Sequence, residues 1–72
     1  MKVSLKKTKI QRILAHKHMS QNWLAGKIGV GSGYMSQLMT GYRNPSPKLR
    51  IKILSALGIS DENFDDVFEL KD

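Results

Sequence analysis

Residues 21–41 decide the fold of this chain, and they read QNWLAGKIGVGSGYMSQLMTG. The first part of this stretch places three apolar residues on one helical face: Leu24, Ala25 and Ile28. Ser20 precedes the run and is a good N-cap, because its hydroxyl can accept from an unpaired backbone N–H. Gly29 follows the run and can adopt the left-handed conformation that ends a helix. The stretch therefore begins with a short amphipathic helix and a glycine turn.

A second short helix follows this turn, from about Ser32 to Met39. Met35 and Leu38 lie three residues apart on its inward face, and Gly41 ends it. The opposite stripe carries no charge and only small or amide residues: Ser32, Gly33, Ser36 and Gln37. Helix, glycine turn and helix is the layout of a DNA-binding helix-turn-helix.

The uncharged stripe predicts contact with base edges. Small residues allow a helix to enter the major groove, which is about 12 Å wide. Gln37 is the best reader by chemistry, because its amide offers the donor and the acceptor that match adenine. An ordinary solvated face is the simpler interpretation, but such a face would carry Lys and Glu as i,i+4 partners. We therefore expect Ser32, Gly33, Ser36 and Gln37 to read bases.

An ordered series of residues extends the pattern along the chain. It comprises Ser20-Gln21, Leu24-Ala25, Ile28-Gly29-Val30, Tyr34-Met35-Ser36-Gln37-Leu38, Gly41 and Pro45-Ser46-Pro47. The series resembles the lambda-repressor-like helix-turn-helix family, of the Cro and phage-repressor type (XRE). The likeness runs from about Ile10 to Ile59. It implies an all-α, compact five-helix fold, with residues 1–72 as a single DNA-binding domain and the helix-turn-helix core at 20–41.

The resemblance also implies which residues touch the DNA backbone. A glutamine at the start of the first of the two helices contacts phosphate in the family, and the start of the N-terminal helix lies near the backbone. The loop after the second helix has Arg43 at its basic centre, which reaches either phosphate or the minor groove. Tyr34 either packs at the turn or donates its hydroxyl to phosphate. The predicted phosphate contacts are Lys6, Lys7, Gln21, Tyr34, Thr40, Tyr42 and Arg43.

Two positions depart from the family pattern. Gly31 stands where Ser or Thr usually caps the second helix, so Ser32 is an alternative cap. Met39 stands where relatives often carry Glu, paired with an Arg whose position here is Leu14. We therefore expect an apolar contact between Leu14 and Met39 in place of the ion pair.

Charge is divided sharply along the chain. Residues 1–60 contain eleven Lys or Arg and no acid, whereas the last twelve residues hold all six acids and one Lys. The two parts carry +11 and −5, which gives the net charge of +6. A polyanionic partner is the simplest reason for the basic part. An anionic membrane surface is the competitor, but the basic residues are not gathered on one long amphipathic helix.

The rest of the pattern predicts three more helices. Residues 1–4 are expected to be loose and a first helix to run from about Leu5 to Lys17. Ser46 and Pro47 open a fourth helix that Gly58 ends. An acidic C-terminal helix is expected at about 60–70, with an apolar face that closes the core or forms a dimer seam: Phe64, Val67 and Phe68.

Composition argues against several other classes of protein. There is no cysteine, and His16 and His18 fall on different sides of a helix, so no metal site is expected. No nucleophile or pair of acids gathers in one place, so we expect no enzyme, no cofactor and no small-molecule ligand. No apolar run approaches the length of a membrane span and no signal-peptide core is present. The cytoplasm, on the nucleoid, is the expected location.

Together these features predict a sequence-specific regulator of double-stranded DNA that represses by occupying its operator. Relatives often bind palindromes as dimers with half-sites about 34 Å apart, and the sequence leaves open whether this chain forms a homodimer. A DNA-binding antitoxin or phage excision subunit, whose main partner is another protein, is the alternative. RNA binding or protein binding on the same fold is a further one.

Overall fold

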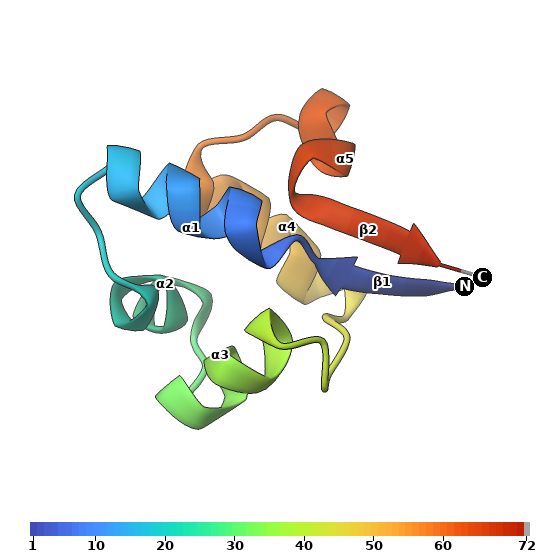
Figure 1. Cartoon of the computed structure of the whole chain (residues 1–72), viewed down its shortest axis with the longest axis horizontal. Helices are drawn as coiled ribbons and strands as arrows, with labels where there is room; N and C mark the ends of the chain where they lie inside the picture. The colour runs from blue at the N-terminus through green and yellow to red at the C-terminus, as the bar shows by residue number, and fades with distance from the viewer. Residues whose placement is uncertain (72) are drawn as a thin grey trace.

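Short helices follow one another along the chain, and the strands at its two ends pair as a two-stranded ribbon (Figure 1). The computed structural model describes residues 1–71. Its elements are β1 (Lys2–Leu5), α1 (Lys7–His16), α2 (Gln21–Ile28), α3 (Ser32–Met39), α4 (Pro47–Leu57), the 3-10 turn η1 (Asp61–Asn63), α5 (Phe64–Val67) and β2 (Phe68–Lys71). Figure 1 shows α3 at one side of the molecule and α5 at the opposite side.

Side-chain caps and a left-handed glycine fix the helix ends where the sequence predicts them. The Ser20 hydroxyl oxygen accepts a hydrogen bond from the Trp23 N–H over 3.0 Å, and Ser46 accepts one from the Leu49 N–H over 3.2 Å. Gly29 ends α2 with φ at 79°, a conformation that residues with a Cβ rarely adopt. These local signals confirm the starts of α2 and α4 and the turn that leads into α3.

The core takes an apolar face from each α-helix and from the ribbon. Its largest fully buried side chains are Ile10, Leu24, Ile28, Met35, Leu38, Ile53, Leu57, Val67 and Phe68. Leu14 and Met39 also belong to this core, with 4% and 3% of their surfaces exposed. Both positions are therefore apolar and buried, as an apolar contact between them requires, while the direct Leu14–Met39 contact stays a prediction.

The N-terminal residues are a strand and not a loose segment. Lys2–Leu5 form β1, and α1 begins at Lys7, two residues later than expected. Val3 and Leu5 are both buried, which is the alternation of a half-buried strand. The Lys6 N–H then donates to the Val67 carbonyl over 2.8 Å, so the backbone turns from β1 into α1 while bonded to the end of α5.

The predicted helix at about 60–70 is wrong from Phe68 onward. After η1, α5 makes a single turn and ends at Val67, and Phe68–Lys71 form β2, antiparallel to β1. The spacing of Phe64, Val67 and Phe68 fits a helix, but Phe68 is paired with Leu5 in the ribbon and only 1% of it is exposed. Phe68 therefore closes the core from a strand, and its ring stacks on that of Phe64 with centroids 4.6 Å apart. The fold is mostly helical with a small sheet, and not purely all-α.

We expect Phe68→Ala to lower the free energy of unfolding by about 3–5 kcal/mol, because it empties a large site in the core. Leu70→Ala is the matched control on the same strand, since 48% of Leu70 is exposed; its cost should stay below about 1 kcal/mol. Urea unfolding followed by circular dichroism measures both. Equal costs for the two variants would contradict the placement of Phe68 in the core.

Candidate nucleic-acid interface

The helix-turn-helix pair is held together by its turn and by one side-chain bridge. The Val30 N–H donates to the Ala25 carbonyl over 2.9 Å, which closes the turn after α2, and Val30 packs against the core. The Gln21 amide at the start of α2 donates to the Ser36 hydroxyl on α3 over 3.3 Å. The start of α2 and the outward face of α3 therefore lie side by side.

The predicted base-reading stripe points to solvent. Ser32, Gly33 and Ser36 are exposed and Gln37 is half-buried, while Met35, Leu38 and Met39 fill the core from the other side of α3. The N-cap of α3 is Gly31, which makes no side-chain cap, and Ser32 is already the first residue of the helix. The alternative in which Ser32 caps α3 is therefore wrong.

Gln37 and Arg43 form a unit that the sequence pattern does not predict. The Arg43 Nε–H donates to the Gln37 side-chain oxygen. The Arg43 N–H donates to the Gln37 carbonyl over 3.1 Å, and the Thr40 hydroxyl donates to the same carbonyl over 3.3 Å. The loop after α3 thus folds back on the helix and holds the candidate base reader.

Tyr34 completes this unit on its other side. The Arg43 guanidinium carbon lies 5.2 Å from the centre of the Tyr34 ring, within the range of a cation–π contact. The Tyr34 ring therefore supports Arg43, whichever partner its hydroxyl takes. Arg43 is shared between an aromatic face and an amide oxygen, and its other N–H groups remain available for an outside acceptor.

The other predicted phosphate contacts are spread over several elements. Tyr42 stands in the loop after α3 with 79% of its surface exposed, and Lys7 is exposed at the start of α1. Lys6 is different, because it is half-buried and its ammonium donates to the Asp65 carbonyl over 2.7 Å. Lys6 is therefore engaged with α5, at the C-terminal side of the chain.

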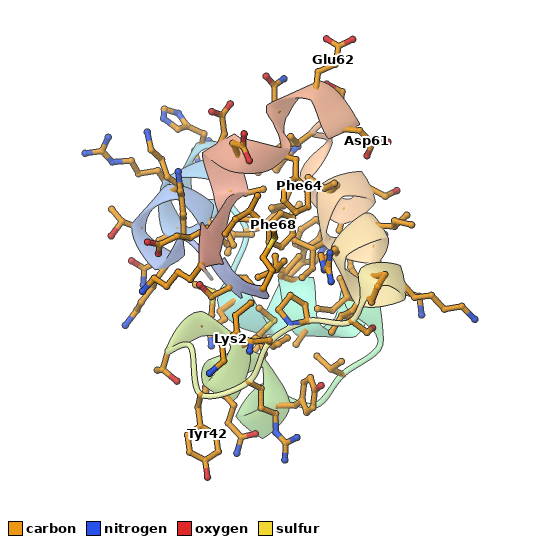
Figure 2. All side chains as sticks on the ribbon, turned by 90° about the vertical axis from the view of Figure 1, so that its right-hand side faces the viewer. Lys2, Tyr42, Asp61, Glu62, Phe64 and Phe68 are labelled. Carbon is orange, nitrogen blue, oxygen red and sulfur yellow. The ribbon has the colours of Figure 1, made fainter. Side chains whose placement is uncertain are left out.

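Lys2 is a cation that the sequence pattern does not mark as a DNA contact. β1 contacts α3, and Figure 2 shows Lys2 on the same side of the molecule as Tyr42. The alternation of Val3 and Leu5 is the signal that could have placed it, because it predicts a strand and not a loose end. The ribbon thus adds a positive charge on the side of the molecule that carries Tyr42.

Four of the six acidic residues lie away from α3. Asp61 and Glu62 belong to η1, and Asp65 and Asp66 belong to α5, which Figure 1 places across the molecule from α3. Within residues 1–71, the one ion pair is the exposed Lys71–Glu69 contact at 3.9 Å. A polyanion at α3 would therefore meet cations without facing this acidic surface.

The part of the chain that the structure describes contains no group of three or more His, Asp or Glu side chains placed to hold a metal ion. None of its helices is both long enough and apolar enough to cross a membrane.

This arrangement defines a helix-turn-helix DNA-binding domain. A family model described as Helix-turn-helix matches residues 10–64, more than half of the chain, and the chain belongs to that family, of the Cro and phage-repressor (XRE) type. The match confirms the resemblance seen in the sequence and makes the chain a DNA-binding regulator of XRE type. No curated protein and no solved structure gives a significant match.

We expect Gly33→Ala to stabilise the domain by up to about 1 kcal/mol while weakening its binding to DNA. Nothing lies within 4 Å of a Cβ built at Gly33, so the methyl fits the free protein and removes the helix penalty of glycine. The same methyl would stand on the stripe that we predict to approach the bases. Thermal unfolding and a DNA titration of the same preparation measure the two effects.

Gly29→Ala is the control for this prediction. Its φ of 79° makes any Cβ strained, so this variant should lose stability by about 1 kcal/mol or more. If Gly33→Ala bound DNA as tightly as the unmodified protein, close approach at that position would be refuted.

Proposed function

We propose that this protein represses transcription by occupying a specific operator, with α3 in the major groove. The exposed, uncharged stripe of α3 carries the proposal, because it presents small residues and one amide reader on the side opposite the core. Selection of bound sites from a random duplex pool tests it. A short enriched motif is the expected result, and a pool without enrichment would reject sequence-specific binding.

Gln37 is proposed as the main base reader. Its side-chain oxygen accepts from Arg43 but has a second lone pair, and its NH₂ group offers two donors. It can therefore meet the N6 amino group and N7 of adenine while it keeps the bond to Arg43. At neighbouring base pairs, the Ser32 and Ser36 hydroxyls would contact base edges, and Gly33 would let the helix backbone come close to them.

The surrounding polar and basic residues are proposed to position the protein on phosphates. Thr40, Tyr42 and Arg43 follow the C-terminal end of α3, and Tyr34 lies in its first turn, against Arg43. Gln21 stands beside Ser36 at the outward face of α3. Lys7 lies at the start of α1, and Lys6 would have to exchange its Asp65 carbonyl for a phosphate. Such contacts fix register and supply affinity that falls as salt rises.

Repression would follow from steric exclusion of polymerase at the occupied site. A palindromic operator bound by two copies is the arrangement that the family pattern favours, with half-sites about 34 Å apart. Competition among duplex DNA, duplex RNA and single strands checks the assignment to duplex DNA. A preference for either of the other two nucleic acids would replace it.

We expect Gln37→Ala to cost about 1–3 kcal/mol on the selected site and to relax the preference at one base pair. Gln11→Ala is the matched control, because Gln11 is exposed on α1. Fluorescence-anisotropy titrations on the selected duplex and on single-base variants of it measure both effects. An equal loss on selected and random duplexes would remove Gln37 from the base-reading role.

Arg43 should contribute to affinity and to specificity by separable means. Arg43→Ala is expected to weaken binding to every duplex and to reduce the salt slope by about 1, because one phosphate contact is lost. Arg43→Lys keeps the charge but not the Nε–H that bonds Gln37, so it should keep the slope and relax the preference at the Gln37 base pair. Titrations over a range of salt on the two classes of duplex distinguish the variants. A lysine variant with unchanged specificity would show that Arg43 does not position Gln37.

A further inference from the structure

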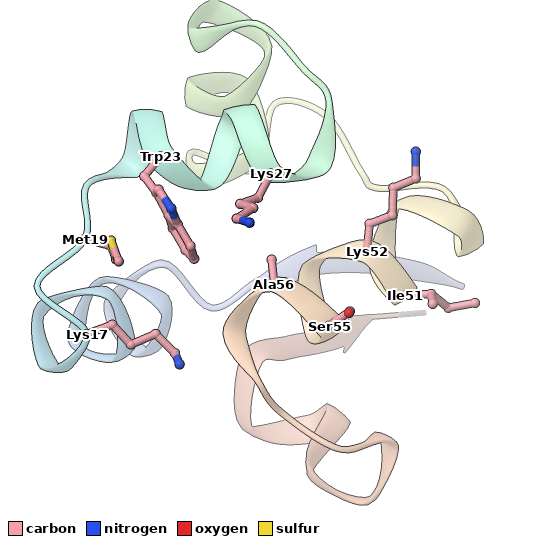
Figure 3. Close-up of a pocket in the computed structure, with 8 residues that line it drawn as sticks. All are labelled: Lys17, Met19, Trp23, Lys27, Ile51, Lys52, Ser55 and Ala56. Atoms are coloured by element: carbon pink, nitrogen blue, oxygen red, sulfur yellow. The ribbon is translucent and has the colours of Figure 1, made fainter.

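A basic hollow lies between the end of α1, α2 and α4 (Figure 3). Its volume of about 710 Å³ is within the range of small-molecule sites, roughly 300–1,000 Å³. Three lysines border it, one from each of these segments, and no acidic residue lines it: Lys17, Lys27 and Lys52. None of the lining residues belongs to α3 or to the loop after it, so the proposed DNA contacts leave the hollow unused.

The wall of the hollow is apolar and contains the single Trp of the chain. Figure 3 shows the Trp23 ring pointing from α2 toward α4, and the Ala56 methyl pointing back toward α2. Met19 and Ile51 also line the hollow, although 43% and 64% of their surfaces are exposed. An aromatic ring suits this wall, because indole rings pack favourably against other rings and a thioether sulfur contacts ring edges.

Two of the three ammonium groups are held at the border of the hollow by contacts within the chain. Lys27 lies over the Trp23 ring, with its ammonium 5.8 Å from the ring centre. The Lys17 ammonium lies 3.5 Å from the position that a Cβ on Gly58 would take, at the C-terminal end of α4. The helix dipole favours a cation there. Within residues 1–71 the one ion pair is elsewhere, between Lys71 and Glu69, so no carboxylate neutralises these lysines.

We propose that the hollow binds a small molecule in which an aromatic ring carries a phosphate group. The ring lies on the wall of Trp23, Met19 and Ala56, and the phosphate meets the lysine ammonium groups. A phosphate suits three cations better than a carboxylate does, because it carries about −1.5 to −2 charges and three strong acceptor oxygens. No local pattern in the sequence marks this site, because the three lysines are far apart in the chain and only the packing of α4 beside α2 brings them together.

This site goes beyond the proposed repressor function and does not depend on it. Its residues are separate from the proposed DNA contacts, so ligand binding can be measured on the full-length protein without DNA. The three lysines are exposed, and exposed charges are screened within about 8 Å at physiological ionic strength. We therefore expect the affinity for the ligand to fall as salt is added.

Titration with naphthyl phosphate at low salt tests the site. The chain has one Trp, so the indole N–H of Trp23 gives a single, unambiguous signal in the NMR spectrum of the isotope-labelled protein. Naphthyl phosphate should move this signal saturably, together with the backbone amides of Lys27 and Ala56. Naphthylmethanol lacks the charge and inorganic phosphate lacks the ring. Each should bind at least about fivefold more weakly, which is the effect of one unit charge about 4 Å from another in water.

Two pairs of variants separate charge from packing. Ser55 is exposed and lines the hollow, so Ser55→Glu adds a carboxylate there while Ser55→Gln adds a side chain of the same size without charge. Ser55→Glu should weaken binding of naphthyl phosphate about fivefold or more, and Ser55→Gln should leave it within about twofold. Lys27→Gln should weaken it similarly, whereas Lys9→Gln, on an exposed position of α1 outside the hollow, should not. Circular dichroism confirms that each variant is folded.

Several outcomes would overturn the site. The Trp23 indole signal could stay still, naphthylmethanol could bind as tightly as the phosphate, or Ser55→Glu could bind like Ser55→Gln. Tighter binding of naphthoate would reject the phosphate group, and tighter binding of polyglutamate would assign the hollow to an acidic protein.

Two further arms exclude other occupants of the hollow. If the indole signal moved on dilution of the protein alone, a second copy of the chain would cover the hollow. If duplex DNA moved the signal and abolished the response to naphthyl phosphate, the lysines would be contacts to DNA phosphates. Failure of DNA binding by a protein that still binds naphthyl phosphate would reject the proposed function and leave the ligand site intact.

Discussion

The burial of one face of α3 is the constraint on which the rest of the molecule depends. The core buries three side chains of the eight-residue helix α3: Met35, Leu38 and Met39. Their burial fixes the rotation of the helix about its own axis. Side chains on the opposite face then have to point to solvent, because helical spacing places them there. The proposed interface for DNA is in this sense a consequence of core packing and of the turn at Gly29.

The contact between Gln37 and Arg43 joins two roles that are usually described separately. Base contacts specify and phosphate contacts position, but here the residue proposed for phosphate holds the side chain proposed for the base. The Tyr34 ring contacts the Arg43 guanidinium, and the Thr40 hydroxyl donates to the Gln37 carbonyl, so both residues restrain the same unit. A fixed amide loses less side-chain entropy on binding than a mobile one, which favours discrimination between bases.

Charge is separated in space as it is along the chain. The cations of residues 1–60 include Arg43 beside α3 and Lys17, Lys27 and Lys52 around a hollow between α1, α2 and α4, while η1 and α5 carry four of the six acids at the far side.

The sequence by itself determined α2, α3 and α4, their caps and the outward position of the α3 stripe. Capping and helical periodicity act within about four residues, so a short window such as Ser20 to Gly29 contains the information. Only the tertiary structure decided the ribbon, the early end of α5, the engagement of Lys6 with Asp65 and the bond from Arg43 to Gln37. The ribbon pairs Lys2 with Lys71, at opposite ends of the chain, and the spacing of Phe64, Val67 and Phe68 fits a helix as well as it fits the observed turn and strand. Which of these forms depends on whether β1 is present to pair with Phe68, and no window of local sequence contains both partners.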